Sequence, residues 1–478
     1  MNMSLFLPEL ALISMALVFF FMSLGKPKSS FLQGVALAQA AIVVFIALFA
    51  FKFSCNQPAQ TMFYDAYRVD AFSQLFKIIL TFGLFLVIYL GAGLKGITDN
   101  LKAEYYMFMT LSVLGLVFLS SAVELLTIVI SLEISSFALY VIIPFRFQKG
   151  YRKQMEAGIK YVMFGAMATG ISLYGMSYIY GMAHTTYLNE LVQVLPGMLK
   201  HQPAIIIGLI LMMASFFYKL AMFPMHFWAP DVYEGSSNET AGFIATLPKV
   251  GAVALLIRLV ALAGIEINQI TGILAIFAIL SMVVGNLSAL VQDDLKRLLA
   301  YSSIAHAGYV MVAILCVNTL GFSAAIYYIA GYLVMNLACF YVIYNISPKG
   351  ENVTFADLKG LYKNSPMLAL TLVLGAFGMA GIPPTVGFFG KFFIFTAAIE
   401  KSLYAIVILT VINAGISAFY YLKMVRAAFM TSDEESSVIQ MDLSAYILGL
   451  ILIVTILGIG IFPQTFMHYA EMAAGTIL

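Results

Sequence analysis

The chain has 478 residues, of which 62% are hydrophobic and only 10% are charged. A soluble domain carries about 25% charged residues, so this composition excludes a soluble globular protein. The net charge of +2 is small and scattered along the chain, which excludes a nucleic-acid-binding surface.

Apolar runs of about twenty residues, the length that crosses a bilayer, recur from end to end. The first run starts near the N-terminus without a basic region or a cleavage site, so we interpret it as a span rather than a signal peptide. Backbone groups in lipid must be hydrogen-bonded internally, so the spans are predicted to be helices. We expect about fourteen of them, near 5–24, 31–51, 71–94, 105–122, 124–144, 156–182, 203–223, 241–263, 267–291, 299–317, 321–346, 365–400 (interrupted), 403–428 and 443–465.

The basic residues predict the orientation of these spans. Fifteen of the 25 Lys and Arg residues fall in the loops on one side, four fall on the other side, and six lie within spans. Because basic loops stay in the cytoplasm, the first side is predicted to be cytoplasmic and both termini to face outward.

Two spans contain helix-breaking residues. The first break follows Lys219 and includes Pro224 and Pro230; the second comprises Gly378, Gly381, Pro383, Pro384 and Gly387 and precedes Lys391. Proline removes a helix donor, and irregular backbone at membrane depth survives only where protein buries it or where it lines a watery cavity. The breaks lie five spans apart, which predicts two repeats of opposite topology, as in inverted-repeat transporters.

Glu133 lies about nine residues from either end of its span, too deep for its short side chain to reach water. A carboxylate at that depth is costly unless it is paired or protonated. We expect it to pair with Lys219, which precedes the first break. Burial and a nearby carboxylate shift the proton affinity of a lysine in opposite senses, so such a pair is suited to proton exchange; a structural ion pair that fixes helix packing is the alternative.

Three further lysines are candidates for proton transfer. Lys160 lies about one turn inside its helix, where a side chain reaching the membrane surface is an equal alternative. Lys249 follows Pro248, and Lys391 follows the second break. Because each of the last two neighbours irregular or glycine-rich helix, we favour proton relay over an interfacial position for both.

Other titratable residues have less definite predictions. His306 titrates near neutrality when unperturbed and is either a relay group or a hydrogen-bonded packing residue. Lys77 and Arg258 lie nearer span ends, so their side chains are expected to reach the membrane surface. His226 and Glu234 follow the first break and either gate water or are simply solvated.

The sequence offers no cofactor site. Cys55, Cys316 and Cys339 are far apart, whereas an iron–sulfur cluster normally needs four thiolates, so we expect no cluster and no electron transfer within this chain. Gly91-Ala92-Gly93-Leu94-Lys95-Gly96 matches the dinucleotide fingerprint, but it follows an apolar helix rather than a strand. No metal-binding motif is present in the sequence.

At these residues the chain resembles the antiporter-like membrane subunits of respiratory complex I, and among them the N-type. The resemblance covers nearly the whole chain. Its motifs are Ser131-Leu132-Glu133, Gly158-Ile159-Lys160-Tyr161, the run from Pro224 to Gly235 after Lys219, Pro248-Lys249, the run from Lys296 to His306, and the run from Gly381 to Phe392. One stretch departs from the family, which usually has prolines and small residues where this chain has Ser236 to Thr240; Glu239 would add a charge there.

The resemblance implies an all-α fold of fourteen helices: three spans in 1–103, inverted five-helix repeats in 104–263 and 267–428, and a last span in 443–478. Glu133 and Lys219 would form the input pair, with Lys160 near proton uptake, Lys249 linking the half-channels and His306 leading to Lys391.

It also implies proton pumping coupled to electron transfer from NADH to quinone, in the bacterial inner membrane. NAD, FMN, iron–sulfur clusters and quinone would be bound by other membrane and peripheral subunits, and this chain would contact the lipid bilayer and those subunits. A subunit of a multisubunit cation/proton antiporter, a subunit of a membrane-bound hydrogenase and a non-conducting structural segment remain alternatives.

Overall fold

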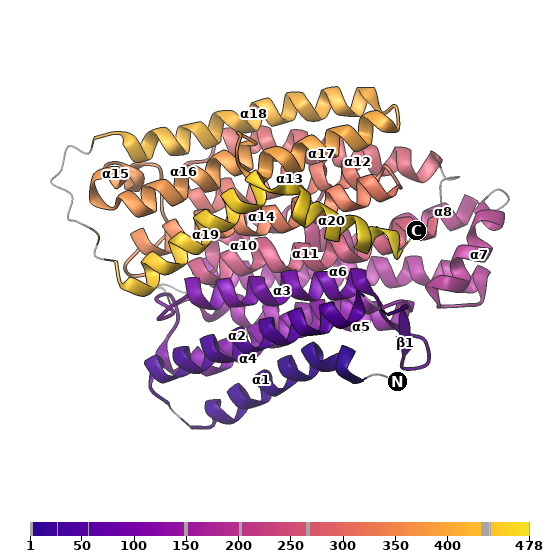
Figure 1. The fold of residues 1–478 in the computed structure, drawn as a ribbon, viewed down its shortest axis with the longest axis horizontal. Helices are drawn as coiled ribbons and strands as arrows, with labels where there is room; N and C mark the ends of the chain where they lie inside the picture. The colour runs from indigo at the N-terminus through magenta and orange to yellow at the C-terminus, as the bar shows by residue number, and fades with distance from the viewer. Residues whose placement is uncertain are drawn as a thin grey trace.

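The computed structural model is a bundle of helices that run side by side along the long axis of the molecule (Figure 1). It describes residues 3–25, 27–55, 57–147, 152–199, 203–263, 268–431, 439 and 441–477. Both termini lie at the same end of the bundle, and the short helix α15 (Leu361–Asn364) lies at the other end (Figure 1).

The N-terminal part consists of three long helices and a hairpin. The helices are α1 (Leu7–Ser23), α2 (Ser29–Ser54) and α3 (Ala71–Leu90), and between α2 and α3 the strands β1 (Gln60–Met62) and β2 (Tyr67–Val69) pair antiparallel. Short 3-10 turns precede α1 (Met3–Phe6) and follow α3 (Asp99–Leu101). Asp70 begins α3 through a reciprocal cap, because its carboxylate accepts from the Ser73 amide and the Ser73 hydroxyl accepts from the Asp70 amide. The hairpin was not expected from the sequence.

The next segment contains the first interrupted span. Its elements are α4 (Lys102–Ser121), α5 (Leu125–Ile142), a 3-10 turn (Ile143–Phe145), α6 (Arg152–Ala183), α7 (Leu188–Leu199), α8 (Pro203–Met212), α9 (Ala214–Leu220), α10 (Trp228–Gly235) and α11 (Asn238–Ala263). The short helix α7 was not expected as a separate element.

The last segment contains the second interrupted span and ends in two C-terminal helices. Its elements are α12 (Asn268–Leu290), α13 (Leu295–Ile314), α14 (Thr319–Ile346), a 3-10 turn (Ala356–Leu358), α15, α16 (Pro366–Ala380), α17 (Val386–Glu400), α18 (Tyr404–Phe429), α19 (Leu443–Ile461) and α20 (Pro463–Gly475). The C-terminal span is therefore a helix pair that changes direction at Phe462–Pro463.

Within the described part of the chain, twelve helices are long and apolar enough to cross a membrane, and two shorter apolar helices cover Ala204–Leu220 and Pro366–Ala380. The two shorter helices belong to the spans for which the sequence predicts breaks. Each ends in a left-handed residue, Ala221 (φ 56°) and Gly381 (φ 90°), which stops the helix. The chain resumes as α10 and α17, so both predicted breaks are confirmed.

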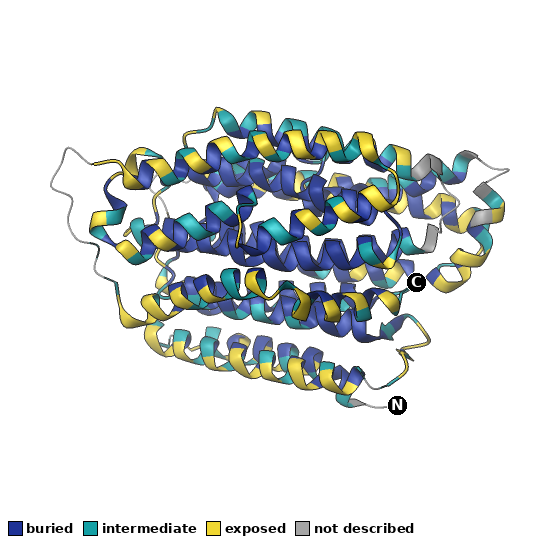
Figure 2. Cartoon of the chain, turned by 45° about the horizontal axis from the view of Figure 1, so that its top comes forward, coloured by how far each residue is buried: buried dark blue, intermediate teal, exposed yellow. Residues whose placement is uncertain are grey.

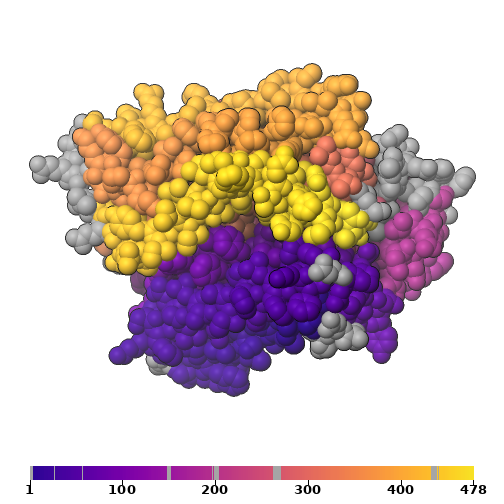
Figure 3. All heavy atoms as spheres, in the orientation of Figure 1, coloured from indigo at the N-terminus to yellow at the C-terminus, as the bar shows by residue number. Residues whose placement is uncertain are grey.

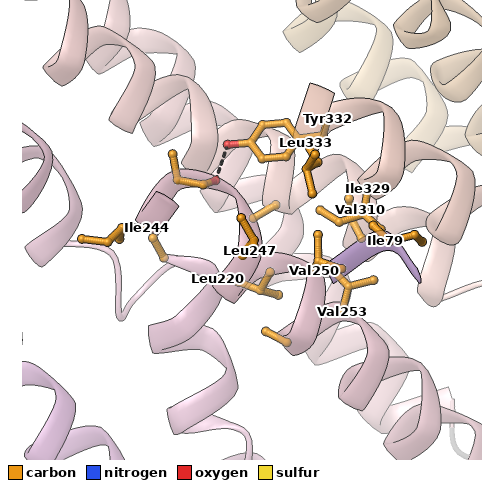
Figure 4. Packing of buried hydrophobic residues seen from close by; sticks show 14 of the residues in the cluster. Ile79, Leu220, Ile244, Leu247, Val250, Val253, Val310, Ile329, Tyr332 and Leu333 are labelled. Carbon is orange, nitrogen blue, oxygen red and sulfur yellow. Dashed lines mark hydrogen bonds between the residues drawn. The ribbon is translucent and has the colours of Figure 1, made fainter. Parts of the chain in front are cut away.

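Burial separates a core from a lipid-facing shell (Figure 2). The most apolar windows of α11 and α14 are entirely buried, whereas those of α2 and α18 are only 28% buried. At the centre, Leu220, Leu247 and Leu333 belong to a packed apolar cluster that joins α9, α11 and α14 (Figure 4). The helices α19 and α20 lie along the seam between the N-terminal helices and the later segment (Figure 3), where they contact α14, α16, α17 and α3.

Candidate functional site

Lys219 lies in the last turn of α9, directly before the first break, and is 2% exposed. Its ammonium nitrogen is 3.5 Å from the Ser135 hydroxyl of α5. In the described residues it has no carboxylate within ion-pair distance. The break therefore places a lysine side chain inside the bundle, next to the Ser135 hydroxyl.

Glu133 lies on α5 and is half-buried, and its Oε1 accepts a hydrogen bond from the Thr169 hydroxyl of α6 at 2.6 Å. It interacts with Lys219 electrostatically through space, but the structure gives no direct ion pair between them. The two residues predicted to pair thus lie in one electrostatic neighbourhood, each held by a different hydroxyl group.

Lys249 connects the first break to the second half of the bundle. Its side chain is buried on α11, and its Nζ donates to the Leu220 carbonyl at 3.0 Å and to the Ser303 hydroxyl at 2.8 Å. Leu220 is the last residue of α9, so its carbonyl lacks a partner within its own helix. Lys249 supplies that partner and at the same time contacts α13.

His306 lies one turn beyond Ser303 on α13 and is 2% exposed. Both ring nitrogens have phenol partners: Nδ1 is 2.6 Å from Tyr328 Oη, and Nε2 is 2.9 Å from Tyr421 Oη. The Tyr421 hydroxyl also contacts Ser302. A fully bonded imidazole among hydroxyl groups fits both alternatives left by the sequence, proton relay and packing.

Lys391 lies on α17 and reaches back to the end of the other half of its broken span. Its Nζ donates to the carbonyls of Met379 (2.9 Å) and Ala380 (2.8 Å), which end α16, and lies 5.1 Å from the centre of the Tyr309 ring. Helix C-termini attract cations. At both breaks, a buried lysine therefore binds the carbonyls that the interruption leaves free.

Lys160 differs from the central lysines because its side chain is 34% exposed. It binds Glu156 of α6 and Asp231 of α10 at 2.6 and 2.5 Å. Asp231 and Glu234 in turn both bind Arg297 of α13 at 2.7 Å. Glu234, which the sequence left unassigned, thus ties the second half of the broken span to α13, and Lys160 belongs to the same surface network.

The prediction for Lys77 and Arg258 is wrong. Neither side chain reaches the membrane surface, because Lys77 is fully buried against Glu9 at 2.6 Å and Arg258, only 4% exposed, lies against Asp70 at 2.9 Å. The distance of a residue from the end of its span does not reveal an ion-pair partner on another helix. Glu9 and Asp70 are both remote in sequence from the residues they bind.

Sequence reasoning also missed other buried charges. It gave no role to Glu9 or Asp70, although a carboxylate within or beside an apolar run is a detectable signal. It counted Lys296 among the basic loop residues, whereas the structure buries that side chain completely. Glu239, noted as an added charge, is 1% exposed and accepts from the Gly96 amide at 3.4 Å. The 91–96 glycine motif follows helix α3, so it lacks the strand that a dinucleotide site requires.

His226, the other residue left unassigned after the first break, is 5% exposed and stacks against the Phe223 ring at 5.7 Å. It is therefore not simply solvated. No group of three or more His, Cys, Asp or Glu side chains that could hold a metal ion occurs in the described ranges.

Comparison with known proteins agrees with this arrangement. Residues 122–417 match the family described as NADH:quinone oxidoreductase/Mrp antiporter, TM. NADH-quinone oxidoreductase subunit N 2 of Opitutus terrae is 47% identical over 460 residues, which cover 96% of this chain and 95% of that protein.

Solved structures agree as well. A chain of respiratory complex I from Thermus thermophilus superposes with a TM-score of 0.81 at 27% identity, covering 96% of this chain and 98% of that one. A chain of the Mrp complex from Dietzia sp. gives a TM-score of 0.88 at 17% identity and covers 100% and 98%, which shows a shared fold. The chain belongs to the NADH:quinone oxidoreductase/Mrp antiporter membrane family, among the relatives named NADH-quinone oxidoreductase subunit N.

Proposed function

We propose that this chain is the proton-translocating N subunit in the membrane arm of an NADH:quinone oxidoreductase. It holds no redox centre of its own. NAD, FMN, iron–sulfur clusters and quinone are bound by its partner subunits, and the energy of electron transfer reaches this chain through the membrane arm.

The observation that supports this function most strongly is the row of buried basic groups between the two breaks. Lys219, Lys249 and Lys391 are each at most 5% exposed, and none has a carboxylate within ion-pair distance among the residues that the structure describes. A buried ammonium without a counter-ion costs free energy. A purely structural network would pair these charges, as Asp70 and Arg258 are paired.

The contacts suggest an order for proton transfer. Lys219 precedes the Leu220 carbonyl that Lys249 binds, and Lys249 binds Ser303, one turn before His306. His306 lies 5.6 Å, ring to ring, from Tyr309, and the Tyr309 ring centre also lies 5.1 Å from the Lys391 nitrogen. In this proposal hydroxyl groups and water bridge the gaps between these basic groups.

In this proposal, electron transfer is coupled to proton transfer through the charges of Glu133 and Lys219. Quinone reduction elsewhere in the complex changes the field at Glu133 and thereby the proton affinity of Lys219. Moving one charge across 100 mV costs about 2.3 kcal/mol, which corresponds to a change of about fiftyfold in proton affinity. Lys160, whose side chain is 34% exposed and binds Asp231 of α10, is the proposed uptake group.

We also propose the inverted repeats at 104–263 and 267–428 and a topology with both termini in the periplasm of a bacterial inner membrane. The matching order of helices around the two broken spans supports the repeats. The excess of basic residues in the loops at the opposite end supports the orientation. Cysteine accessibility from either side of sealed vesicles tests the orientation.

The test uses the intact complex in proteoliposomes. Lys219→Ala and Lys391→Ala should lower the ratio of protons translocated to electrons transferred, whereas Lys401→Ala, at an exposed position, should not. An unchanged ratio in both buried variants would refute the relay. Translocation that requires sodium in the buffer would favour the cation/proton antiporter alternative.

A further inference from the structure

A cavity of about 500 Å³ opens at the end of the bundle opposite the hairpin, outside both broken spans (Figure 1). It lies where α1 ends, α2 begins and the turn Asp99–Leu101 leads into α4. Its wall includes Met22, Lys28, Asp99 and Glu104, and we call it the α1–α2 cavity. Pockets that bind small molecules have volumes of about 300–1,000 Å³, so this cavity has room for a ligand.

One side of the cavity carries positive charge. Lys28 and Ser29 line it at the N-terminus of α2, and no side chain of a described residue caps that terminus. The free amides at the start of a long helix attract anions. Lys102 lies behind this terminus and donates to the Ser29 hydroxyl at 2.9 Å. Its ammonium also binds the Gly93 carbonyl and the Asp99 carboxylate, both at 2.7 Å, so the ion pair with Asp99 is already complete.

The other side carries a negative charge without a counter-ion. Glu104 lies in the first turn of α4 and lines the cavity, and its Oε2 is buried without a hydrogen-bond partner. Among the described residues, no cation lies within ion-pair distance of this carboxylate. An acid in the first turn of a helix stabilises that helix, but buried polar groups are normally also hydrogen-bonded. A ligand that carries a cation would neutralise Glu104.

The surroundings of the cavity are those of a lipid site. Helix α1 lies at the outer edge of the bundle (Figure 1), and the most apolar windows of α1 and α2 are only 44% and 28% buried. Next to the lining residues in the sequence, Phe21, Leu24 and Phe31 are exposed. A polar cavity at the ends of spans, beside exposed apolar side chains, suits a molecule with a charged head and apolar chains.

We propose that the α1–α2 cavity binds the headgroup of an aminophospholipid, with the phosphate at Lys28 and the N-terminus of α2 and the primary ammonium at Glu104. The acyl chains extend along the exposed apolar side chains of α1 and α2. Phosphatidylethanolamine has this headgroup. Phosphatidylcholine has no N–H donor for the carboxylate, and phosphatidylglycerol has no cation, so the site prefers phosphatidylethanolamine to both.

The test measures which lipids contact this chain in the complete complex. The complex is depleted of its own lipids and placed in phosphatidylcholine nanodiscs that contain a trace of phosphatidylethanolamine with a photoreactive diazirine on an acyl chain. After illumination, labelled peptides from the end of α1 and the start of α2 are quantified by mass spectrometry. Unlabelled phosphatidylethanolamine should compete about tenfold better than phosphatidylglycerol, the factor expected for one hydrogen bond between charged groups.

Two variants assign the two ends of the headgroup. Glu104→Gln keeps the shape of the side chain and removes its charge, so the preference for phosphatidylethanolamine over phosphatidylglycerol should disappear. A role of Glu104 limited to helix stability would leave that preference unchanged. Lys28→Met should lower labelling by photoreactive forms of both lipids, because both contain a phosphate. Lys359→Met, which removes an exposed lysine beside α15 at the same end of the bundle, is the control and should leave labelling unchanged.

Three outcomes would overturn the proposal. Absence of labelling at this junction by any lipid would show that the cavity is empty or covered by another subunit. Equal competition by phosphatidylethanolamine and phosphatidylglycerol in the unmodified complex would show that no ammonium is recognised. Equal competition by phosphoethanolamine, which has the same charges but no acyl chains, would show that the ligand is a soluble compound. These readouts do not involve proton translocation, so the lipid site and the proposed function can fail separately.

Discussion

Replacement of Lys249 by methionine tests the junction between the two halves of the bundle. Methionine fills a similar volume, so packing around the fully buried α11 is preserved while three hydrogen bonds, to Leu220 and Ser303, are lost. The Leu220 carbonyl ends a helix and has no other partner among the described residues, so leaving it unsatisfied should cost about 1–3 kcal/mol of stability.

The effect of this change on proton transfer should be far larger. Without the amine, a proton that moves from the Lys219 region to Ser303 crosses a buried gap without a basic group, and an unpaired charge there costs several kcal/mol. Each 1.36 kcal/mol added to the barrier slows a step about tenfold. We therefore expect proton transfer through this chain to fall at least about a hundredfold in Lys249→Met.

The assay is NADH-driven acidification of proteoliposomes, recorded together with NADH oxidation by the same sample. Lys401→Met provides the control, because it removes an exposed lysine at the surface of the bundle. A Lys249→Met complex that assembles and translocates protons at the ratio of the unmodified complex would show that protons do not pass this junction.

Three further predictions concern stability and the less buried lysine. Burial raises the pKa of Asp70, but the Arg258 guanidinium and the Ser73 amide outweigh it and hold that pKa below its ordinary value. The ionised Asp70 carboxylate therefore stabilises the fold fully above the unfolded pKa of about 3.9, and this stabilisation is lost as pH falls through the folded pKa. Thermal melts of Asp70→Asn should show a loss of about 3–5 kcal/mol in the free energy of unfolding near neutral pH. This loss should shrink in acid, and a loss that does not change with pH would contradict the argument. Gly387→Ala should destabilise the second break by about 1–3 kcal/mol, because a Cβ there would lie 1.8 Å from the Gly378 carbonyl oxygen, whereas Gly415→Ala meets open space and should melt normally. Lys160→Met should lower proton translocation less than loss of Lys249 does, because a side chain that is 34% exposed can be bypassed by water; an equal loss would make Lys160 an obligatory step.

The sequence was sufficient to predict the features that follow from local composition. Spans appear as apolar runs, and both breaks appear as Pro and Gly clusters that the structure confirms at Ala221 and Gly381. The burial of Lys219, Lys249 and Lys391 followed from their positions within apolar runs.

Contacts between remote segments could not be predicted in the same way. Lys77 and Arg258 were expected at the membrane surface, because nothing near them in the sequence reveals Glu9 or Asp70 as partners. The binding of the Leu220 carbonyl by Lys249 likewise depends on how α11 packs against α9. Such pairings are set by tertiary packing, and the local signals that were overlooked are the carboxylates Glu9 and Asp70, which lie within or beside apolar runs.

The central claim is that the buried lysines gain and lose protons during turnover, and Lys391→Arg tests it most directly. Arginine keeps a cation beside the Met379 and Ala380 carbonyls but retains its proton. The proton-to-electron ratio of the assembled complex should fall in this variant. A ratio equal to that of the unmodified complex would mean that a permanent charge suffices at this position, and the relay would be contradicted.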